Sequence, residues 1–508
     1  MVLDVKRPAE VEKTRVDLPV TAMEFEIMDS IRNNDVTIIC GETGSGKSTQ
    51  IPAYLYEGGM SLCPSDPSKS YMIGITQPRR VAAVSTAKRV CFELGQGDGQ
   101  SIRRSGGRGN LVSYKTRYES AGSGDSTRIQ FMTDGILLSE IQSDLLLRKY
   151  SVIVLDESHE RNLNTDVLIG LLSVALPLRK KAALEDPSIV PLKLVLMSAT
   201  LRVEDFTKNA RLFPTGPPAV VTVPGRTHPV TIHHSKVTEL DDYEEIAFQK
   251  ICKIHHKLPH GGILVFLTGK AEIIRMTNRL RKALSESESV PKHAYVLPLY
   301  SLLSGDEQAK IFSPAPDNHR LIVLATNIAE TSITIPGVSY VVDTGRQKCR
   351  NYNSGTGVAS YDIMWISKAS ANQRAGRAGR TGPGHCYRLY SSSLFSRHMD
   401  DFALPEVLTR PLEDIVLAMK SMNISSVSSF PFPTPPDKSQ IEAAVKLLAN
   451  IGCVDISNME RDGGDGAVTK LGKAVSKLPL GVRYAKILLV AAQAGILDYA
   501  IVVVAILS

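Results

Sequence analysis

The sequence predicts an α/β protein in which two tandem parallel-sheet lobes precede a mostly helical region. Short apolar segments alternate with longer amphipathic ones through roughly the first 400 residues, which is the pattern of βαβ units. The series of strands restarts after a link that contains proline and glycine, Val223-Pro224-Gly225-Arg226-Thr227-His228-Pro229. Beyond about residue 403 the strands fade and helical patterns dominate.

Each element is predicted from its own pattern. Strands are expected at seven apolar segments: Val36–Cys40, Tyr71–Thr76, Ser151–Leu155, Leu192–Met197, Gly262–Phe266, Leu321–Ala325 and Ser339–Val342. Helices are expected at Ser48–Leu55, Leu412–Met422 and Lys438–Ile451. The proline-rich segment Phe430–Pro436 cannot be helical and is predicted to be a rigid connector.

Length and composition limit the class of protein. A chain of 508 residues is too long for one core and suggests roughly three domains. The net charge of +7 is compatible with a polyanionic partner without demanding one. The seven cysteines are scattered with no C-x-x-C pair, which argues against a zinc site or a disulfide framework and favours a reducing compartment. The N-terminus lacks the apolar core of a signal peptide.

The last segment, Ile487 to Ser508, is long and apolar but is interrupted by Gln493, Gly495 and Asp498. These polar breaks favour two buried helices over a membrane-spanning helix, so no membrane partner is expected. Because so apolar a helix needs partners, we expect the chain to be cut inside a domain.

The most specific pattern is a phosphate-binding loop, G-x-x-x-x-G-K-[ST], between the strand at Val36–Cys40 and the helix at Ser48–Leu55. Its glycines let backbone N–H groups converge on an anion, and the helix N-terminus adds partial positive charge. The alternative is a glycine-rich turn with a chance lysine, which the strand–turn–helix context disfavours. The candidate residues for binding a nucleoside triphosphate are Gly41, Glu42, Thr43, Gly44, Ser45, Gly46, Lys47, Ser48 and Thr49.

Two adjacent acids follow the predicted strand Ser151–Leu155. Asp156 is the candidate for holding Mg²⁺ through water together with Ser48, and Glu157 is the candidate general base that also faces the metal. The alternative is that Asp156 is a helix N-cap and Glu157 lies in the first turn of that helix. Without the phosphate-binding loop, the two interpretations would be equally well supported.

The second lobe carries Gln373-Arg374-Ala375-Gly376-Arg377-Ala378-Gly379-Arg380. Small neighbours let guanidinium groups reach into a cleft, and transfer of a γ-phosphoryl group needs donated positive charge. Arg377 and Arg380 are the candidate arginine fingers, and Gln373 the candidate for orienting the attacking water. A basic nucleic-acid patch or a solvated helix face is the alternative.

These segments together resemble the DEAH-box RNA helicases. Asp156-Glu157-Ser158-His159 resembles the DEAH box, and further motifs of that family occur in order: Thr76-Gln77-Pro78-Arg79-Arg80, Thr116-Arg117-Tyr118, Thr133-Asp134-Gly135, Ser198-Ala199-Thr200, Phe266-Leu267-Thr268-Gly269 and Ala325–Ser332. The resemblance covers about residues 20 to 508. It implies an N-terminal extension (1–20), two RecA-like lobes (21–226 and 227–403), a winged-helix domain (404–478) and the start of a helical ratchet bundle (479–508).

The chain departs from the family pattern at a few positions. Ser158 replaces an alanine and Ser48 a threonine, and both are expected to be tolerated. In many relatives a phenylalanine after the segment Asp343-Thr344-Gly345 stacks on the nucleotide base, whereas this chain has Arg346. By similarity Arg89 covers the other face of the base. Two arginines predict a loose base clamp, so NTPs other than ATP are expected to be accepted.

For RNA, the resemblance implies sequence-tolerant gripping of phosphates and sugars by Arg80, Thr116, Arg117, Thr133, Thr268, Thr326 and Asn327. Ser198 and Thr200 are implied to couple hydrolysis to RNA. The segment Arg350–Val358 resembles the β-hairpin that acts as a wedge against duplex in this family.

The sequence therefore indicates an RNA-stimulated NTPase that moves RNA in the 3′-to-5′ direction, with ATP and Mg²⁺ between the lobes. Leu194–Asn209, Leu258–Glu272 and Phe430–Pro436 resemble the subgroup that assembles the small ribosomal subunit. Pre-ribosomal RNA, an activating protein and a nucleolar location are the corresponding expectations. The alternatives are a splicing helicase, a nucleotide-gated RNA clamp that hydrolyses little, and an unrelated P-loop kinase.

Overall fold

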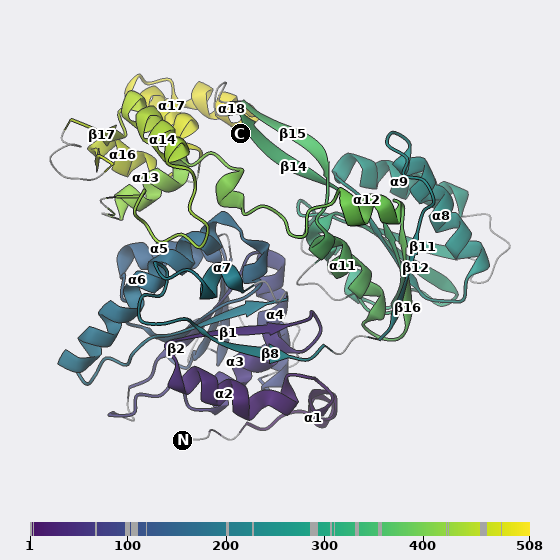
Figure 1. Ribbon diagram of the computed structural model, residues 1–508, viewed down its shortest axis with the longest axis horizontal. Coiled ribbons are helices and arrows are strands. Elements are labelled where there is room, and N and C mark those ends of the chain that lie inside the picture. The colour runs from purple at the N-terminus through teal and green to yellow at the C-terminus, as the bar shows by residue number, and fades with distance from the viewer. Residues whose placement is uncertain are drawn as a thin grey trace.

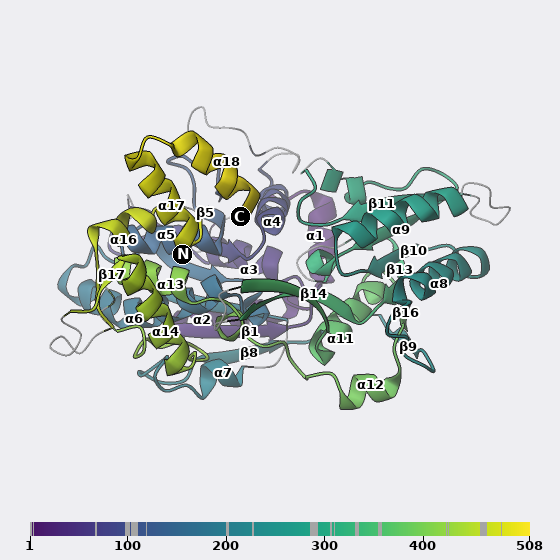
Figure 2. The same ribbon diagram turned by 90° about the horizontal axis from the view of Figure 1, so that it is seen from above.

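The computed structural model describes residues 3, 5–66, 69–96, 102, 110–117, 119–199, 203–225, 228–284, 293–304, 307–308, 310–330, 335–353, 358–422, 424, 426–457, 465–478 and 480–507. Two α/β lobes built on parallel sheets are followed by a helical region, as the sequence predicted (Figure 1). The lobes lie side by side, and the C-terminal helices lie over the first lobe in both views (Figures 1 and 2).

The first sheet has the strand order β4-β3-β5-β2-β6-β7-β1-β8, and only β4 runs antiparallel to its neighbour. Its strands are β1 (Val36–Gly41), β2 (Met72–Gln77), β3 (Val112–Lys115), β4 (Ser120–Ala121), β5 (Ile129–Thr133), β6 (Tyr150–Leu155), β7 (Lys193–Ser198) and β8 (Ala219–Val223). The helices are α1 (Ala9–Val16), α2 (Glu24–Asn33), α3 (Lys47–Glu57), α4 (Arg80–Glu93), α5 (Asp134–Ser143), α6 (Leu163–Glu185) and α7 (Glu204–Thr207).

Because side chains alternate along a strand, the first sheet buries both of its faces. Ile39 packs in a cluster with residues of α2, α3 and α4. Its neighbour Ile38 packs in a second cluster with residues of α5 and α6. The second cluster continues into the C-terminal helices α13 (Glu413–Ser421) and α14 (Lys438–Ile451), so these helices and the first lobe share one core.

The second sheet has the order β11-β12-β10-β13-β16-β9, with all neighbours parallel. Its strands are β9 (Val230–His234), β10 (Gly262–Phe266), β11 (His293–Leu299), β12 (His319–Ala325), β13 (Val338–Asp343) and β16 (Gly384–Arg388). Helices α8 (Tyr243–Lys257) and α9 (Lys270–Ala283) pack on one face and α11 (Lys368–Gly376) on the other, with α12 (Ser392–Arg397) following β16. The seven predicted strands all occur, with ends shifted by at most two residues.

The predicted hairpin is present as an antiparallel pair that projects from the second lobe as a separate arm, β14 (Arg346–Asn353) and β15 (Val358–Trp365) (Figure 1). Residues 354–357 at its turn lie outside the described residues. The C-terminal region adds β17 (Val454–Asp455), β18 (Ala467–Val468), α16 (Lys470–Val475), α17 (Val482–Gln493) and α18 (Leu497–Leu507).

The last apolar segment forms two helices, α17 and α18, as predicted, but the prediction that both are buried is wrong. In α18 only Ala500 and Val504 are buried, because the described residues place no element over its outer face. Several large apolar side chains are therefore exposed: Ile487, Val490, Ile501, Val502, Val503, Ile506 and Leu507. Among the described residues, no helix combines the length and hydrophobicity that crossing a bilayer requires.

Candidate nucleotide site and nucleic-acid track

The strand order divides the loops of the first lobe into two groups at the carboxyl edge of the sheet. The loops after β6, β7 and β1 are neighbours and carry Asp156, the end of β7 at Ser198, and the phosphate-binding loop. The loops after β3, β5 and β2 are also neighbours and carry the predicted RNA residues. Ligands of open parallel sheets bind at this edge, so the topology predicts two adjacent sites.

The phosphate-binding loop has the backbone that its glycines allow. Gly44 and Gly46 adopt the left-handed region, with φ of 95° and 93°. Gly46 is the N-cap of α3, so the free N–H groups of that helix open onto the loop. Lys47 is buried and donates to the carbonyl of Glu42 at 3.1 Å and to the hydroxyl of Ser45 at 3.2 Å, as well as to the carbonyl of Gly41. The lysine is thus held at the mouth of an anion-binding cradle.

Asp156 and Glu157 lie directly after β6 and are both buried. One oxygen of Asp156 accepts from the Glu157 N–H at 2.8 Å, and the other accepts from the amide of Gln77. Burial and the Glu157 charge raise the pKa of Asp156 to about 7. The hydrogen bond from Ser48 and the charge of Lys47 lower this pKa but do not cancel the shift. Glu157 itself adopts a left-handed φ of 53°, a conformation that is uncommon outside glycine. The pair is a buried acidic centre whose charge a cation would relieve.

The second lobe contributes two arginines to this centre, the buried Arg377 and the half-buried Arg380. Arg377 donates to the carbonyl of Glu330, and Arg380 lines the same pocket as Glu157. Burial lowers the pKa of Arg380 to about 10, while Glu157 opposes that shift. Burial and the neighbouring Arg380 charge lower the pKa of Arg377, and Glu157 again opposes. Two neighbouring guanidinium groups of this kind are suited to binding a polyphosphate.

All of these groups except Arg377 border one cavity of about 630 Å³ between the lobes. The predicted residues that line it are Thr43, Gly44, Gly46, Lys47, Ser48, Thr49, Arg89, Asp156, Glu157 and Arg380. Of the other predicted loop residues, Gly41 and Ser45 hold Lys47 from behind, and the Glu42 side chain lies against Gly225. Arg89 is oriented by Glu93, which accepts from its Nε at 2.5 Å and from Gln50 at 2.6 Å.

The structure leaves three predicted nucleotide residues away from this cavity. Asp343 is fully buried inside the second lobe, where its carboxylate accepts from Arg374 at 2.8 Å and from Tyr390 at 2.8 Å. Arg346 lies over the rings of Tyr243 and Trp365, 4.3 and 4.7 Å from their centroids. Gln373 lies on α11, partly exposed, and is not among the lining residues. The placement of Asp343 and Arg346 corrects the expected base clamp.

The aromatic residue that the second lobe places in the cavity is instead Phe312, at the end of a short 3₁₀ turn, Lys310–Phe312. It is 38% exposed and shares the cavity lining with Arg89, so an aromatic face is available to a ligand. Sequence reasoning missed Phe312 because it lies in no recognised motif. The aromatic residue in an otherwise turn-like segment, Ile311-Phe312-Ser313-Pro314, was the one available signal.

The predicted RNA residues lie beside or shortly after the carboxyl ends of strands. In the first lobe Thr116 follows β3, Thr133 ends β5, and Arg80 begins α4 after β2. In the second lobe Thr268 follows β10 and Thr326 follows β12, with Asn327 next to it. Arg80, Arg117 and Asn327 are exposed. Thr116 and Thr268 are buried and partly used in local contacts, since their hydroxyls donate to the Glu119 carbonyl and to Glu272.

Arg79, to which the sequence analysis assigned no role, contacts both lobes beside these candidate RNA residues. Its guanidinium donates to the Asn327 carbonyl of the second lobe at 3.0 Å and to Glu160 of the first lobe at 3.3 Å. This contact joins the end of the DEAH-like box to the RNA side of the second lobe.

The predicted coupling segment touches the acidic centre through a histidine. His159 Nδ1 accepts from the Ala199 N–H at 3.2 Å and lies 3.6 Å from Glu157. Ser198, at the end of β7, is buried, and Thr200 lies outside the described residues. The Ser158 hydroxyl donates to the Met197 carbonyl at 2.9 Å, so the serine that replaces alanine fastens the box to β7.

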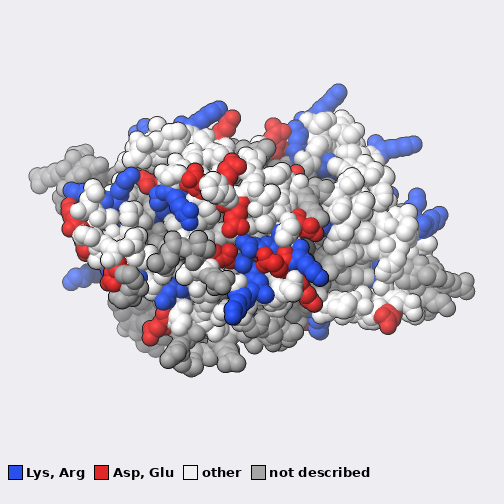
Figure 3. Space-filling view, turned by 90° about the horizontal axis from the view of Figure 1, so that it is seen from below, with Lys and Arg blue, Asp and Glu red and all other residues white. Residues whose placement is uncertain are grey.

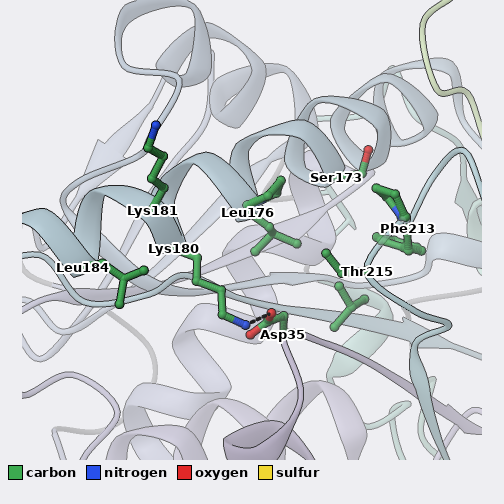
Figure 4. A pocket seen from close by; sticks show the side chains of 11 residues that line it. Asp35, Ser173, Leu176, Lys180, Lys181, Leu184, Phe213 and Thr215 are labelled. Atoms are coloured by element: carbon green, nitrogen blue, oxygen red, sulfur yellow. Dashed lines mark hydrogen bonds and ion pairs between the residues drawn. The ribbon is translucent and has the colours of Figure 1, made fainter.

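A second cavity of about 270 Å³ lies beside α6 and the start of β1 (Figure 4). Lys180 turns to Asp35, with which it forms a 2.9 Å ion pair, and Lys181 points away. The remaining walls include Leu176, Leu184 and Phe213. Because Asp35 precedes β1, this cavity lies at the opposite end of that strand from the phosphate-binding loop.

The charge of the surface is mixed on the face seen from below, where acidic and basic side chains gather together near the centre (Figure 3). The net charge of +7 therefore does not produce one broad basic surface on this face. The candidates for RNA binding are therefore the individual residues at the strand ends rather than a broad basic surface.

Fold and site together define a two-lobed P-loop protein in which the second lobe contributes Arg380 to the cavity beside the phosphate-binding loop. Residues 21–208 match the DEAD/DEAH box helicase family and residues 246–382 match the helicase conserved C-terminal domain. The chain belongs to the DEAD/DEAH box helicases, and the predicted resemblance to the DEAH-box helicases is confirmed.

Curated relatives align with nearly the whole of this chain. A Saccharomyces cerevisiae protein named "Probable ATP-dependent RNA helicase DHR1" is 44% identical over 100% of this chain and 44% of its own length. The human "Probable ATP-dependent RNA helicase DHX37" is 41% identical, over 99% of this chain and 49% of the relative. The Arabidopsis thaliana "ATP-dependent RNA helicase DEAH13" is 40% identical, over 97% and 50%. The chain thus spans about half the length of the curated relatives it matches.

Proposed function

We propose that this protein is an ATP-dependent RNA helicase that couples ATP hydrolysis to movement along single-stranded RNA and to remodelling of structured RNA or RNPs. The observation that carries the proposal is the cavity between the lobes. The phosphate-binding loop, Asp156, Glu157 and Arg380 all line it. A kinase would not require arginines from a second lobe. A binding clamp would not require an intact Glu157.

The roles of the residues follow from their positions. The α3 N-terminus and Lys47 bind the β- and γ-phosphates, and Glu157 takes the proton of the attacking water. Arg380 and Arg377 stabilise the charge that develops on the transferred phosphoryl group. Gln373 would reach the water only with a further closure of the lobes, since α11 carries it outside the present cavity.

Mg²⁺ fits the donor set. Ser48 and Asp156 are hydrogen-bonded to each other, and Asp156 and Glu157 form a buried acidic pair. A hydroxyl and carboxylates are the oxygen ligands that Mg²⁺ prefers, and the ion would supply charge neutralisation for the phosphates.

The nucleobase is proposed to lie between Arg89 and Phe312, which belong to different lobes. An arginine plane and an aromatic ring both stack on any base, so ATP and other NTPs should bind with little discrimination. Arg346 takes no part in this proposal.

RNA is proposed to cross the strand ends that carry Arg80, Arg117, Thr133, Thr326 and Asn327. Because Arg79 joins the two lobes beside Asn327, bound RNA and lobe closure favour each other, and hydrolysis depends on RNA. The hairpin β14–β15 is proposed to separate duplex from the single strand.

The biological target is proposed to be pre-ribosomal RNA during small-subunit assembly, in the nucleolus and with an activating protein. The support is the resemblance of Leu194–Asn209, Leu258–Glu272 and Phe430–Pro436 to that subgroup. RNA cross-linked to the protein in cells should be enriched in small-subunit precursor rRNA. Enrichment of spliceosomal RNA would favour the splicing alternative.

The test of the enzymatic proposal is steady-state ATP hydrolysis with and without single-stranded RNA. Glu157→Gln should abolish turnover while ATP and RNA still bind. Glu185→Gln, an exposed change at the end of α6, is the matched control and should behave as the unchanged protein. Tight RNA binding without turnover in the unchanged protein would replace the helicase proposal with the clamp.

A further inference from the structure

The N-terminal segment before the family match forms part of the nucleotide cavity. Residues 3 to 20 precede the matched region, which begins at residue 21. Yet Val11, Thr14 and Arg15 of α1, and Leu18 after it, line the same cavity as the phosphate-binding loop. The predicted N-terminal extension is therefore a wall of the site.

Ion pairs anchor α1 to the helix that follows the phosphate-binding loop. The Leu3 N–H donates to the Glu57 carbonyl at 2.8 Å, and Arg7 forms an ion pair with the Glu57 carboxylate. Arg15 reaches the same carboxylate at 3.4 Å and Glu24 at 3.2 Å. Since Glu57 is the last residue of α3, α1 is tied to the helix whose first residue is Lys47.

The residues after α1 also touch the phosphate-binding loop itself. The Val20 N–H donates to the Ser45 carbonyl at 3.1 Å. A Cβ added to Gly46 would lie 3.0 Å from side-chain carbons of both Leu18 and Val20. The segment thus packs tightly on the phosphate-binding loop.

Arg15 lines the cavity, and its guanidinium carries an unused donor. The residue is 8% exposed, and within the described residues its Nε has no hydrogen-bond acceptor. A buried guanidinium N–H without an acceptor is costly, and a ligand oxygen would satisfy it.

Arg15 faces the half of α3 that is remote from the phosphate-binding loop. Its guanidinium carbon lies 5.1 Å from the centroid of the Tyr54 ring and its Nη2 lies 3.4 Å from Glu57, whereas Lys47 is the first residue of the same helix. Arg15 also shares the cavity lining with Glu93, which holds Arg89, the proposed base contact.

We propose that Arg15 binds the ribose–base half of the nucleotide through its Nε, so that α1 sets nucleotide affinity from within the same chain. This inference rests on the proposed function, because it assumes that the cavity binds a nucleotide. It assigns Arg15 a role in the affinity for the nucleoside half of the ligand and none in binding the phosphates.

The test is equilibrium binding of two probes, ADP with Mg²⁺ and inorganic tripolyphosphate with Mg²⁺. Arg15→Lys keeps a charge for Glu57 but removes Nε, and should weaken ADP binding about tenfold, ~1.4 kcal/mol, while tripolyphosphate binding stays unchanged. Lys13→Ala, an exposed change on the same helix, is the matched control. The KM for ATP should rise in Arg15→Lys with little change in kcat.

Each outcome decides the inference. Unchanged ADP affinity in folded Arg15→Lys would overturn it. Equal weakening of both probes would also overturn it, because α1 would then act through the phosphate-binding loop. If the variant does not fold, hydrogen exchange of the unchanged protein decides: ADP should protect amides of residues 11–18, and absence of protection refutes the contact. An unchanged protein that binds neither probe contradicts the proposed function itself.

Discussion

At the scale of single residues, the arginines of one motif have different roles. Arg374 is fully buried and pairs with Glu330 at 3.0 Å and Asp343 at 2.8 Å inside the second lobe. Arg380, six residues on, faces the nucleotide cavity. The motif spacing predicted a reacting pair at Arg377 and Arg380, but it contained no sign of what Arg374 does.

We expect Arg380→Gln to lower kcat on the order of 10³-fold with the melting temperature nearly unchanged, because an arginine facing the phosphoryl group acts in the transition state. Arg374→Gln should instead cost ~3–5 kcal/mol of stability, since it leaves Asp343 and Glu330 buried without their partner. Parallel kinetics and thermal unfolding of both variants check this. An Arg374→Gln protein as stable as the unchanged one would show that the buried pair is not needed for folding.

His255 makes stability depend on pH. It is fully buried, its two ring nitrogens have no partner within the described residues, and Arg320 and His256 are the charged groups near it. Burial lowers the pKa of His255 to about 4, with Arg320 adding to the shift. The unfolded chain therefore binds the proton first, and the free energy of unfolding should fall as pH drops from about 6.5 to about 4.

His255→Leu should remove part of this pH dependence, whereas His256→Leu at the exposed neighbouring position should keep it. Thermal unfolding of the second lobe at pH 7 and pH 5 measures the difference. An equal loss of melting temperature in His255→Leu and the unchanged protein would mean that other groups carry the acid sensitivity.

Contiguous motifs were predictable because the chemistry needs adjacent residues on one loop. The phosphate-binding loop, Asp156 and Glu157 are cases of this kind, and the structure brings them together. Phe312 and Arg79 were not predictable, since their roles come from contacts between lobes that lie far apart in sequence. Asp343 was misplaced because a carboxylate at a strand end can face either the site or the core.

At the scale of elements, the periodicity of apolar residues predicted where helices and strands lie better than it predicted which of them are buried. Helix α14 occurs at Lys438–Ile451 as predicted, because its apolar residues recur at helical spacing and Gly452 ends it in a left-handed conformation. Strands β3 and β5 were missed because buried polar residues, Ser113 and Gln130, interrupt their apolar runs. The apolar composition of α18 predicted burial, so it gave no sign that most of its side chains are exposed.

The connector Phe430–Pro436 docks on α6 at a glycine. A Cβ added to Gly170 would lie 2.4 Å from the Phe430 ring and 2.8 Å from the Pro431 carbonyl oxygen. The Asn209 amide fixes the same segment by donating to the Phe432 carbonyl at 3.1 Å. The C-terminal helices therefore depend on the absence of a side chain in the middle of α6.

We expect Gly170→Ala to destabilise the protein by ~1–3 kcal/mol, because the overpacked contact involves a ring and backbone rather than a flexible side chain. Gly135→Ala in α5 is the matched control, since its nearest neighbour would be 4.0 Å away and alanine favours the helix. Urea unfolding followed by fluorescence compares the two. A Gly170→Ala protein no less stable than the control would mean that the connector can shift away from α6.

At the scale of the whole molecule, the two lobes meet at the cavity beside the phosphate-binding loop and again at Arg79, near the residues proposed to bind RNA. The first junction is the cavity that contains Glu157 and Arg380, and the second is Arg79 between Glu160 and Asn327. RNA bound across both lobes would stabilise the same closed arrangement that brings Arg380 to the phosphates. Coupling between RNA and hydrolysis then requires no separate transmitting element.

Arg79→Ala tests this coupling, because it removes the junction on the RNA side without touching the phosphate-binding loop. Losing charge-assisted hydrogen bonds worth ~1.5 kcal/mol should reduce RNA-stimulated hydrolysis roughly tenfold, while hydrolysis without RNA falls less. Arg148→Ala is the matched control, since that arginine is 61% exposed and has only a local ion pair. Hydrolysis titrated with single-stranded RNA measures both variants. If Arg79→Ala lowers the basal and stimulated rates by the same factor, Arg79 supports the catalytic centre directly, and lobe closure is stabilised by other contacts.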